Sequence, residues 1–289
     1  MKVHVTGGSG FLGGSVLPKL LAAGHATTAL ARTAAAAERV AGLGATPVAG
    51  DLDDPASVDQ AFADSGAEAL VNLASLGFGH APTIVAAAEE AGLKRAVFVS
   101  TTSIFTRMAT ASKPVREAAE ETIRASALDW TIVRPTMIYG APGDRNMARL
   151  VRGLRRLPVF PLPGGGRGLQ QPVHVDDLAG AIVAALGRPL SVRRAYDVAG
   201  PEPLSLRAVI EQAGGAVGRH PRLMPVPLQP VVMMVRIYEA ATPRPKLKAE
   251  QIARLAEDKA VDITAARNDL GFDPRPFAEG IRAEAALVR

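Results

Sequence analysis

Residues 1–134 alternate short apolar or β-branched runs with helical segments, and this alternation limits the folds open to the chain. Strands alternating with helices favour a parallel sheet that is covered on both faces. The runs 97–99 and 132–133 are continuously apolar, as expected for strands buried on both sides. We therefore predict an α/β fold with a doubly wound parallel sheet. Its strands are expected over 3–6, 27–31, 46–49, 69–73, 96–100 and 130–133.

The pattern changes after Tyr139-Gly140, where prolines and the glycine run 164–166 interrupt any regular spacing. Helices are expected farther along, over 174–186, 206–213, 231–239 and 248–255. We predict a dinucleotide-binding domain over 1–160, to which 172–198 return. A smaller α+β substrate or partner domain would comprise 161–171 and 199–289.

Composition excludes several classes of function. The chain has no cysteine, so disulfides, thiolate zinc sites, iron–sulfur clusters and cysteine nucleophiles are ruled out. No apolar run reaches the roughly 18 residues of a membrane span, and a strand-like run begins at Lys2, so we expect a cytoplasmic protein without a membrane partner. The five histidines lack metal-ligand spacing, so no metal is expected. The net charge is +5, but its arginines are scattered and aromatic residues make up only 4%, so we expect no nucleic-acid partner.

A glycine-rich segment, Gly7-x-x-Gly10-x-x-Gly13, directly follows the first expected strand and opens the first helix, which is expected over 11–23. Gly7 permits a tight turn, Gly10 lets backbone N–H groups approach a pyrophosphate, and Gly13 lets the helix lie close to the sheet. The helix N-terminus offers N–H groups and a positive dipole end to phosphates. The segment therefore indicates a dinucleotide site.

Six further segments extend this pattern along most of the chain: Gly50-Asp51-Leu52, Asn72-Leu73-Ala74, Ser100-Thr101, Arg134-Pro135 with Ile138-Tyr139-Gly140, Val173–Ala179, and Leu270-Gly271-Phe272-x-Pro274. With the glycine loop, this ordered set resembles the short-chain dehydrogenase/reductase superfamily, in particular its extended and atypical members related to sugar-nucleotide epimerases. The resemblance implies a Rossmann domain that binds NAD(P). It also implies cofactor contacts from Gly7, Gly10, Phe11, Leu12, Gly13, Asp51, Leu52, Asn72, Leu73, Ala74, Ser100 and Pro135.

The residue after the second expected strand bears on the choice of dinucleotide. NAD-binding domains usually carry Asp or Glu there, whereas this chain has Arg32. An arginine can clamp a 2′-phosphate with its planar donor fork, so we favour NADP over NAD. The resemblance implies that Asp51 hydrogen-bonds the adenine amino group.

The catalytic pair Tyr-x-x-x-Lys, usual in the family that the chain resembles, is missing. The three tyrosines, Tyr139, Tyr196 and Tyr238, are followed four residues later by Gly, Gly and Thr. Two registers fit the expected helix 115–126: Ser112 with Arg116, which we prefer, or Ala109 with Lys113. The catalytic candidates are therefore Thr101, which can polarise a carbonyl, Arg116, which can hold the nicotinamide ribose, and Tyr139. His80 is a weaker candidate for a proton donor.

We predict an NADP(H)-binding oxidoreductase of the atypical extended type, which transfers hydride to or from a small organic substrate without the usual pair. Two alternatives stay open. One is a nucleotide-sugar epimerase- or dehydratase-like enzyme, and the other is a non-catalytic NAD(P)(H)-binding sensor or assembly protein. Exposed helices of this fold class often pair, so a homodimer is a further option.

Overall fold

A computed structural model describes residues 1–140, 143–144, 146–243, 245, 248–254 and 256–288. The chain divides into two compact units. Unit 1 comprises Met1–Thr136, Val175–Val198 and Asp262–Asp273, and unit 2 comprises Met137–His174, Ala199–Val261 and Pro274–Arg289. Residues 137–160, which we expected with the dinucleotide-binding domain, fall in unit 2, and residues 262–273 fall in unit 1.

Unit 1 is built on one seven-stranded sheet in the order β11-β6-β5-β4-β1-β2-β3, and all of its neighbouring strands are parallel. The strands are β1 Lys2–Thr6, β2 Ala26–Ala31, β3 Thr46–Ala49, β4 Ala69–Asn72, β5 Arg95–Val99, β6 Asp129–Pro135 and β11 Arg194–Val198. This arrangement confirms the predicted doubly wound Rossmann fold. The last strand was not predicted, because its polar Arg194 and Asp197 hide the apolar run typical of a buried parallel strand.

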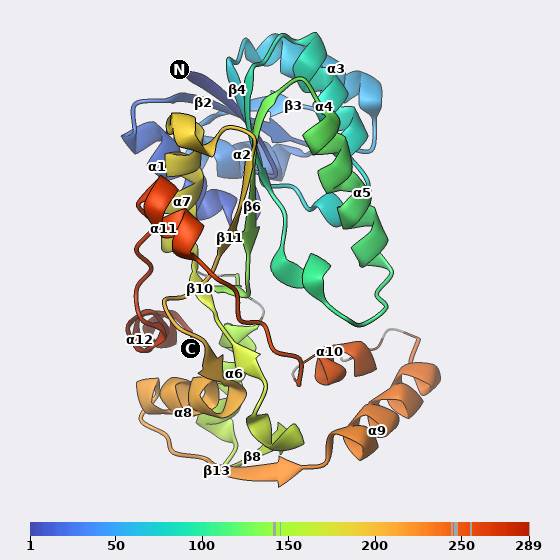
Figure 1. Cartoon of the computed structure of the whole chain (residues 1–289), viewed down its shortest axis with the longest axis vertical. Helices are drawn as coiled ribbons and strands as arrows, with labels where there is room; N and C mark the ends of the chain where they lie inside the picture. The colour runs from blue at the N-terminus through green and yellow to red at the C-terminus, as the bar shows by residue number, and fades with distance from the viewer. Residues whose placement is uncertain (141–142, 145, 244, 246–247, 255, 289) are drawn as a thin grey trace. The chain divides into compact units, whose positions relative to one another are not determined.

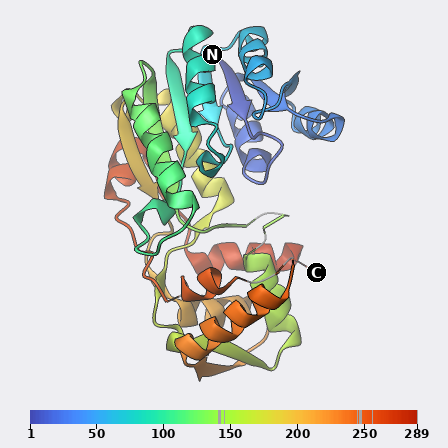
Figure 2. The same cartoon turned by 90° about the vertical axis from the view of Figure 1, so that its right-hand side faces the viewer.

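Helices cover both faces of this sheet (Figure 1). On one face lie α1 Gly13–Ala22, α2 Ala34–Gly42 and α7 Val175–Gly187, with the short α11 Thr264–Leu270 beside α7. The other face carries α3 Pro55–Ser65, α4 Ala81–Glu90 and α5 Ser112–Ala125, and Figure 2 turns this face toward the viewer. Phe62, Phe98, Ile123 and Ile132 are fully buried between these helices and the sheet.

Arg95 fastens the start of β5 to the end of α7. Its guanidinium donates to the hydroxyls of Thr131 at 2.6 Å and Ser191 at 2.8 Å, and to the carbonyls of Ala185 and Leu186. A cation at the carbonyl end of a helix is stabilised by the helix dipole. Burial lowers the pKa of Arg95 to about 10, so the group stays protonated near neutral pH.

Unit 2 combines three strand pairs with five helices in the described part of the chain. Parallel pairs join β7 Ile138–Tyr139 to β10 Val173–His174 and β8 Val159–Pro163 to β13 Arg222–Val226, and an antiparallel pair joins β9 Leu169–Gln170 to β12 Leu204–Ser205. The helices are α6 Met147–Arg156, α8 Leu206–Ala216, α9 Leu228–Ala241, α10 Ala249–Ala253 and α12 Phe277–Leu287. The described residues also form four short 3₁₀ turns: η1 Leu76–Phe78, η2 Thr102–Phe105, η3 Gly164–Gly166 and η4 Pro189–Ser191.

The helix expected over 231–239 is longer than predicted, and the one expected over 248–255 is the shorter α10; Leu255 lies outside the described residues. No helix among the described residues is both long and apolar enough to cross a membrane.

The buried His4 on β1 makes the stability of unit 1 depend on pH. Its Nδ1 lies 2.9 Å from Thr28 Oγ1, its ring packs edge-on against Phe62, and burial lowers its pKa from 6.5 to about 4. The unfolded chain therefore binds a proton that the folded chain excludes. Stability is full above pH 6.5 and falls as the pH drops toward 4.

We expect the free energy of unfolding to fall by about 2 kcal/mol more between pH 7 and pH 5 in the natural protein than in His4→Asn. Asparagine can keep the bond to Thr28 but does not titrate. Denaturant unfolding at several pH values measures this difference, and equal slopes for the two proteins would contradict it.

Candidate functional site

A cavity of about 410 Å³ opens at the carboxyl ends of β1, β2, β3 and β4 in unit 1. It lies at the point where the strand order reverses, because β1 has β4 on one side and β2 on the other. Ligands of open α/β sheets bind at such a switch point. The wall is formed by Gly7, Ser9, Leu30, Arg32, Thr33, Ala36, Gly50, Asp51, Leu52, Asp53, Ala74, Ser75, Phe78 and His80.

The glycine loop is shaped by close backbone contacts. Gly7 has a φ of +73°, a conformation that favours glycine. A Cβ there would also lie only 2.7 Å from the Ala74 nitrogen, so position 7 has no room for a side chain. A Cβ on Gly13 would overlap the Gly8 carbonyl. Gly13 therefore packs against the backbone of the loop that follows β1.

The N-terminus of α1 is electrostatically suited to an anion. This helix has no acidic residue in its first turn and no side-chain hydrogen bond at its cap residue, Leu12. Its first N–H groups lack intrahelical partners, and the dipole places partial positive charge there. The glycine loop and this helix end together form a phosphate-compatible cradle.

Arg32 stands at the end of β2 on the wall of the cavity. Its Nη1 lies 3.7 Å from Asp51 Oδ1 and 3.6 Å from Asp53 Oδ2, and its side chain is 64% exposed. The next residue, Thr33, caps α2 by accepting a hydrogen bond from Ala36 N–H at 3.2 Å. The first turn of α2 has no acidic residue either, and its N-terminus borders the cavity at Thr33 and Ala36.

At the end of β4, Asn72 and Leu73 use their polar groups for hydrogen bonds within unit 1. Asn72 is fully buried, its amide oxygen accepts from Thr6 Oγ1, and its amide nitrogen donates to the Ala74 carbonyl at 3.1 Å. Leu73 N–H donates to the Thr6 carbonyl at 2.9 Å. Of the three residues predicted here as cofactor contacts, Ala74 lies on the cavity wall.

A second polar group, which we call the hydroxyl–arginine cluster, consists of Thr101, Ser103, Ser112 and Arg116. Arg116 Nη1 donates to Ser112 Oγ at 2.7 Å and to Ser103 Oγ at 3.3 Å, and its guanidinium lies over Gly77. Thr101 Oγ1 accepts from Ser103 N–H at 3.2 Å. The cluster joins the turn after β5 to the first turn of α5.

The observed start of α5 at Ser112 favours one of the two predicted registers. Ser112 and Arg116 lie one turn apart on the same helix, and Glu120, which the preferred register places downstream, is 2% exposed. Ala109 precedes the helix, so it cannot pair with Lys113 on one helical face. Lys113 instead donates to the Thr106 carbonyl at 2.9 Å and lies 3.8 Å from Glu117.

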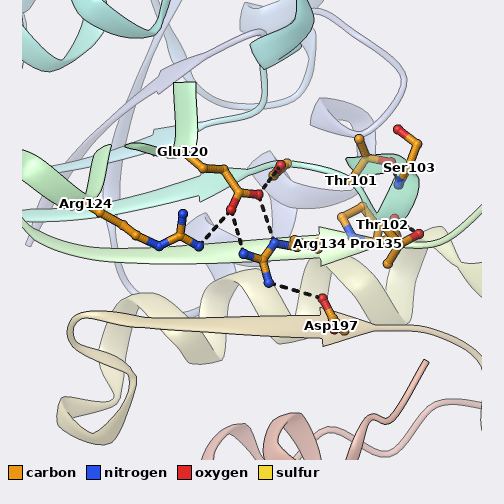
Figure 3. Close-up of polar contacts among 9 residues, drawn as sticks. Thr101, Thr102, Ser103, Glu120, Arg124, Arg134, Pro135 and Asp197 are labelled. Carbon is orange, nitrogen blue, oxygen red and sulfur yellow. Dashed lines mark hydrogen bonds and ion pairs between the residues drawn. The ribbon is translucent and has the colours of Figure 1, made fainter. Parts of the chain in front are cut away.

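A buried network of charged side chains links α5 to the end of β5 and to β6 (Figure 3). Glu120 accepts from Ser100 Oγ at 2.7 Å and from two nitrogens of Arg134 at 2.6 and 2.8 Å, and Arg124 adds a bond of 2.8 Å. Arg134 also lies 3.5 Å from Asp197 on β11. Ser100 was predicted as a cofactor contact, but its hydroxyl donates to Glu120. Beside the network, Thr102 Oγ1 donates to the carbonyl of Pro135 at 3.3 Å.

The network also sets the charge of its two carboxyl groups. Burial alone would raise the pKa of Glu120, yet hydrogen bonds from Arg134, Ser100 and Arg124 bring it below its usual value. Burial raises the pKa of Asp197, although Arg134 opposes this shift. Glu120 is therefore the ionised centre of the network, because it receives most of the donors.

Tyr139 lies in unit 2, in a different setting from the other catalytic candidates. Its side chain is fully buried and packs edge-on against His174 and Phe277. A Cβ on Gly280 would overlap its phenol oxygen. Nearby, burial and the neighbouring Asp144 raise the pKa of Glu284 to about 8. These contacts are those of a core residue of this unit.

Several residues of the cavity wall were not among the predicted contacts, notably Thr33, Asp53, Phe78 and His80. His80 was considered above as a proton donor. Its Nε2 lies 2.9 Å from Oδ1 of Asp53, another residue of the cavity wall. Position after a predicted strand was the available signal for Thr33 and Asp53. Phe78 and His80 are brought in by η1, whose course the sequence pattern did not predict. No cluster of three metal-binding side chains occurs among the described residues.

The fold and the cavity at its switch point define a dinucleotide-binding α/β protein. Residues 7–189 match the profile of a family described as NAD(P)H-binding, and the chain belongs to this family. The predicted resemblance to the short-chain dehydrogenase/reductase superfamily is thereby confirmed.

Similar proteins include a 4-hydroxy-2-methyl-3-oxo-4-farnesyl-3,4-dihydroquinoline-1-oxide ketoreductase of Stigmatella aurantiaca, 27% identical over 95% of this chain and 92% of that protein. The 2-alkyl-3-oxoalkanoate reductase of Stenotrophomonas maltophilia is 28% identical over 98% of both chains. Among solved structures, a UDP-glucose 4-epimerase of Thermus thermophilus in complex with NAD has a TM-score of 0.76 at 23% identity, covering 99% of this chain and 98% of the other.

Removing Glu120 would leave Arg134 buried without its main partner. We expect Glu120→Ala to lower the free energy of unfolding by about 3 kcal/mol or more, the usual cost of breaking a buried ion pair. Glu121→Ala, at the next and exposed position of α5, is the control and should change it by less than about 0.5 kcal/mol. Similar losses for both variants in denaturant unfolding would argue against a stabilising role for the network.

Proposed function

We propose that this protein is an NADPH-dependent reductase that transfers hydride to the carbonyl carbon of a small ketone without a Tyr-x-x-x-Lys pair. The observation that carries the proposal is the cavity at the switch point, with Arg32 and the N-terminus of α2 on its wall. The hydroxyl–arginine cluster after β5 supplies hydrogen-bond donors for the substrate side.

The residues at the cavity fit a dinucleotide phosphate in shape and in charge. Glycines line the tight loop after β1, and two helix N-termini without acidic first turns provide partial positive charge. When bound, the cofactor would supply the hydride. Arg32, Thr33 and Asp51 would hold its adenosine half, and the glycine loop with the start of α1 would hold the pyrophosphate.

Preference for NADPH rests on the geometry of Arg32. The nearest approach to each of its two carboxylates is through Nη1, at 3.6 and 3.7 Å. The edge formed by Nε and Nη2 makes no hydrogen bond with any residue in the described part of the chain. That edge can present two parallel donors to a 2′-phosphate, the arrangement in which arginine binds phosphate best.

On the substrate side, Thr101 is the residue that we assign to polarising the carbonyl. Its oxygen accepts from Ser103 N–H, and its hydroxyl hydrogen has no acceptor among the described residues, so it can donate to a carbonyl oxygen. As hydride reaches the carbonyl carbon, negative charge grows on the oxygen, and a fixed donor stabilises that charge. Thr101 keeps its proton as a hydrogen-bond donor, and the net proton that turns the alkoxide into the alcohol comes from solvent water.

Arg116 is assigned to the nicotinamide ribose. Its Nη1 donates to the hydroxyls of Ser103 and Ser112, which position the guanidinium. An arginine stays charged at any physiological pH and offers a fork of donors where lysine offers a point charge. It can bind ribose hydroxyls, but it cannot act as a proton shuttle, in keeping with proton delivery from water.

The relatives point to ketones as the substrate class. One is named a ketoreductase acting on a farnesylated 3-oxo quinoline oxide, and another is named for 2-alkyl-3-oxoalkanoates. Both names describe a ketone that carries an apolar chain. We therefore propose β-keto acids with an alkyl branch as the first compounds to test.

Arg32→Glu should raise the Kd for NADPH at least about tenfold more than the Kd for NADH, because it replaces a phosphate-binding cation by an anion. Asp53→Asn should lower the Kd for NADPH by about two- to fivefold, because it removes one exposed carboxylate that competes for Arg32. Arg39→Glu, exposed at the other end of α2, is the control and should leave the ratio of the two constants unchanged. Fluorescence titration of each cofactor gives the constants, and equal losses for both cofactors in Arg32→Glu would refute the preference.

Thr101→Val should lower kcat for ketone reduction by about 100-fold or more while leaving the Kd of NADPH within about twofold, because the lost donor acts on the developing oxyanion. Thr102→Val is the matched control, because the hydroxyl of Thr102 already donates to the Pro135 carbonyl. The assay follows NADPH absorbance with 2-alkyl-3-oxoalkanoates. An unchanged kcat would remove Thr101 from the proposal. Tight NADPH binding without turnover across a panel of ketones would favour the non-catalytic alternative.

A further inference from the structure

Helix α9 in unit 2 has apolar side chains on two faces, but only one face is covered. Val232 and Val235 pack with Ala249 of α10 in a small core. On the opposite side, Met233, Met234 and Ile237 are 57%, 62% and 63% exposed. A helix that is apolar on both sides normally has both sides buried, in protein or in lipid.

Strand β13 leads directly into α9, as Figure 1 shows, and it also carries exposed residues. In the β8–β13 ribbon, Arg222 pairs with Val159 and Met224 with Pro161, and all four residues are exposed. The alternating residues Leu223 and Phe160 pack on the core of unit 2. We call the outward residues of β13 and α9, with Val159, the α9 face.

The net charge of unit 2 bears on whether an anionic surface or a second copy of the chain could cover the α9 face. Unit 2 has 18 Lys and Arg against nine Asp and Glu, a formal net charge of +9, whereas unit 1 has 15 against 19, a net −4. The α9 face itself carries Arg222 and Arg236, both exposed. Glu239 is partly buried on α9, where its Oε2 accepts from Ala249 N–H at 2.9 Å. A second copy would bring another unit of charge +9 against the first, which opposes self-association through this face.

We propose that the α9 face binds the surface of an anionic lipid bilayer, with Met233, Met234 and Ile237 entering the interface and Arg222 and Arg236 contacting lipid head groups. An apolar helix side flanked by basic residues is the chemistry of such interfacial helices. Each basic side chain near an anionic membrane contributes about a fivefold gain in partitioning. The proposal departs from the sequence-based expectation of no membrane partner, because the periodicity did not reveal which side of α9 stays uncovered.

The test measures sedimentation of the full chain with vesicles of phosphatidylcholine alone and with vesicles containing about 30% phosphatidylglycerol, in roughly 0.1 M salt. We expect binding to the anionic vesicles, at least about tenfold weaker binding to the neutral ones, and a loss with added salt. The triple variant Met233→Ser/Met234→Ser/Ile237→Ser should bind at least about tenfold more weakly. Leu190→Ser, at a site in unit 1 that is 64% exposed, is the matched control and should bind like the natural chain.

A second readout locates the contact. Because the chain has no cysteine, Ile237→Cys and Leu190→Cys can each carry a single environment-sensitive dye. Only the dye at position 237 should shift its emission when anionic vesicles are added. The proposal fails if vesicles are not bound, if the triple variant binds as well as the natural chain, or if neither dye responds. It also fails if sedimentation equilibrium shows a dimer that the triple variant dissociates, since a second copy would then be the occupant. These readouts do not depend on reductase activity.

Discussion

Glu120 and Arg134 form a buried ion pair that joins helix α5 to β6, the strand beside the edge strand β11 of the parallel sheet. Ser100 at the end of β5, Arg124 on α5 and Asp197 on β11 all contact this pair. The same helix begins with Ser112 and Arg116, and the turn after β5 carries Thr101. The pair therefore fixes the distance between the two segments that bear the hydroxyl–arginine cluster. A buried ion pair is a weak source of net stability but a strict determinant of geometry.

The cavity at the switch point follows from a different constraint, namely backbone packing. Gly7 lies so close to Ala74 that no side chain fits, and this contact holds the loop after β1 against the turn after β4. Gly13 lies closer still to Gly8, within the loop and the start of α1. The carboxyl ends of four strands can then line one cavity, and two helices begin in unit 1 with first turns that contain no acidic residue.

The sheet was predictable because its buried strands are short apolar runs at regular spacing, and five of the predicted cofactor contacts, Gly7, Arg32, Asp51, Leu52 and Ala74, lie on the cavity wall. Local patterns could not reveal β11, whose place in the sheet depends on the chain returning from unit 2. Nor could they reveal that Ser100 and Asn72 direct their polar atoms inward, since this depends on partners 20 and 66 residues away. Tyr139 belongs to a motif that the sequence displays clearly, yet its burial among His174 and Phe277 is a tertiary property.

The two carboxylates beside Arg32 have a consequence for how an anion is received there. The guanidinium already has two opposite charges within 4 Å, so an anion that arrives beside it also meets those two carboxylates. The gain on binding is then the attraction of the guanidinium less the repulsion of the carboxylates, smaller than the attraction alone. Such a site holds its arginine in place without exposing an isolated charge, and it binds an anion less tightly than an arginine without acidic neighbours would.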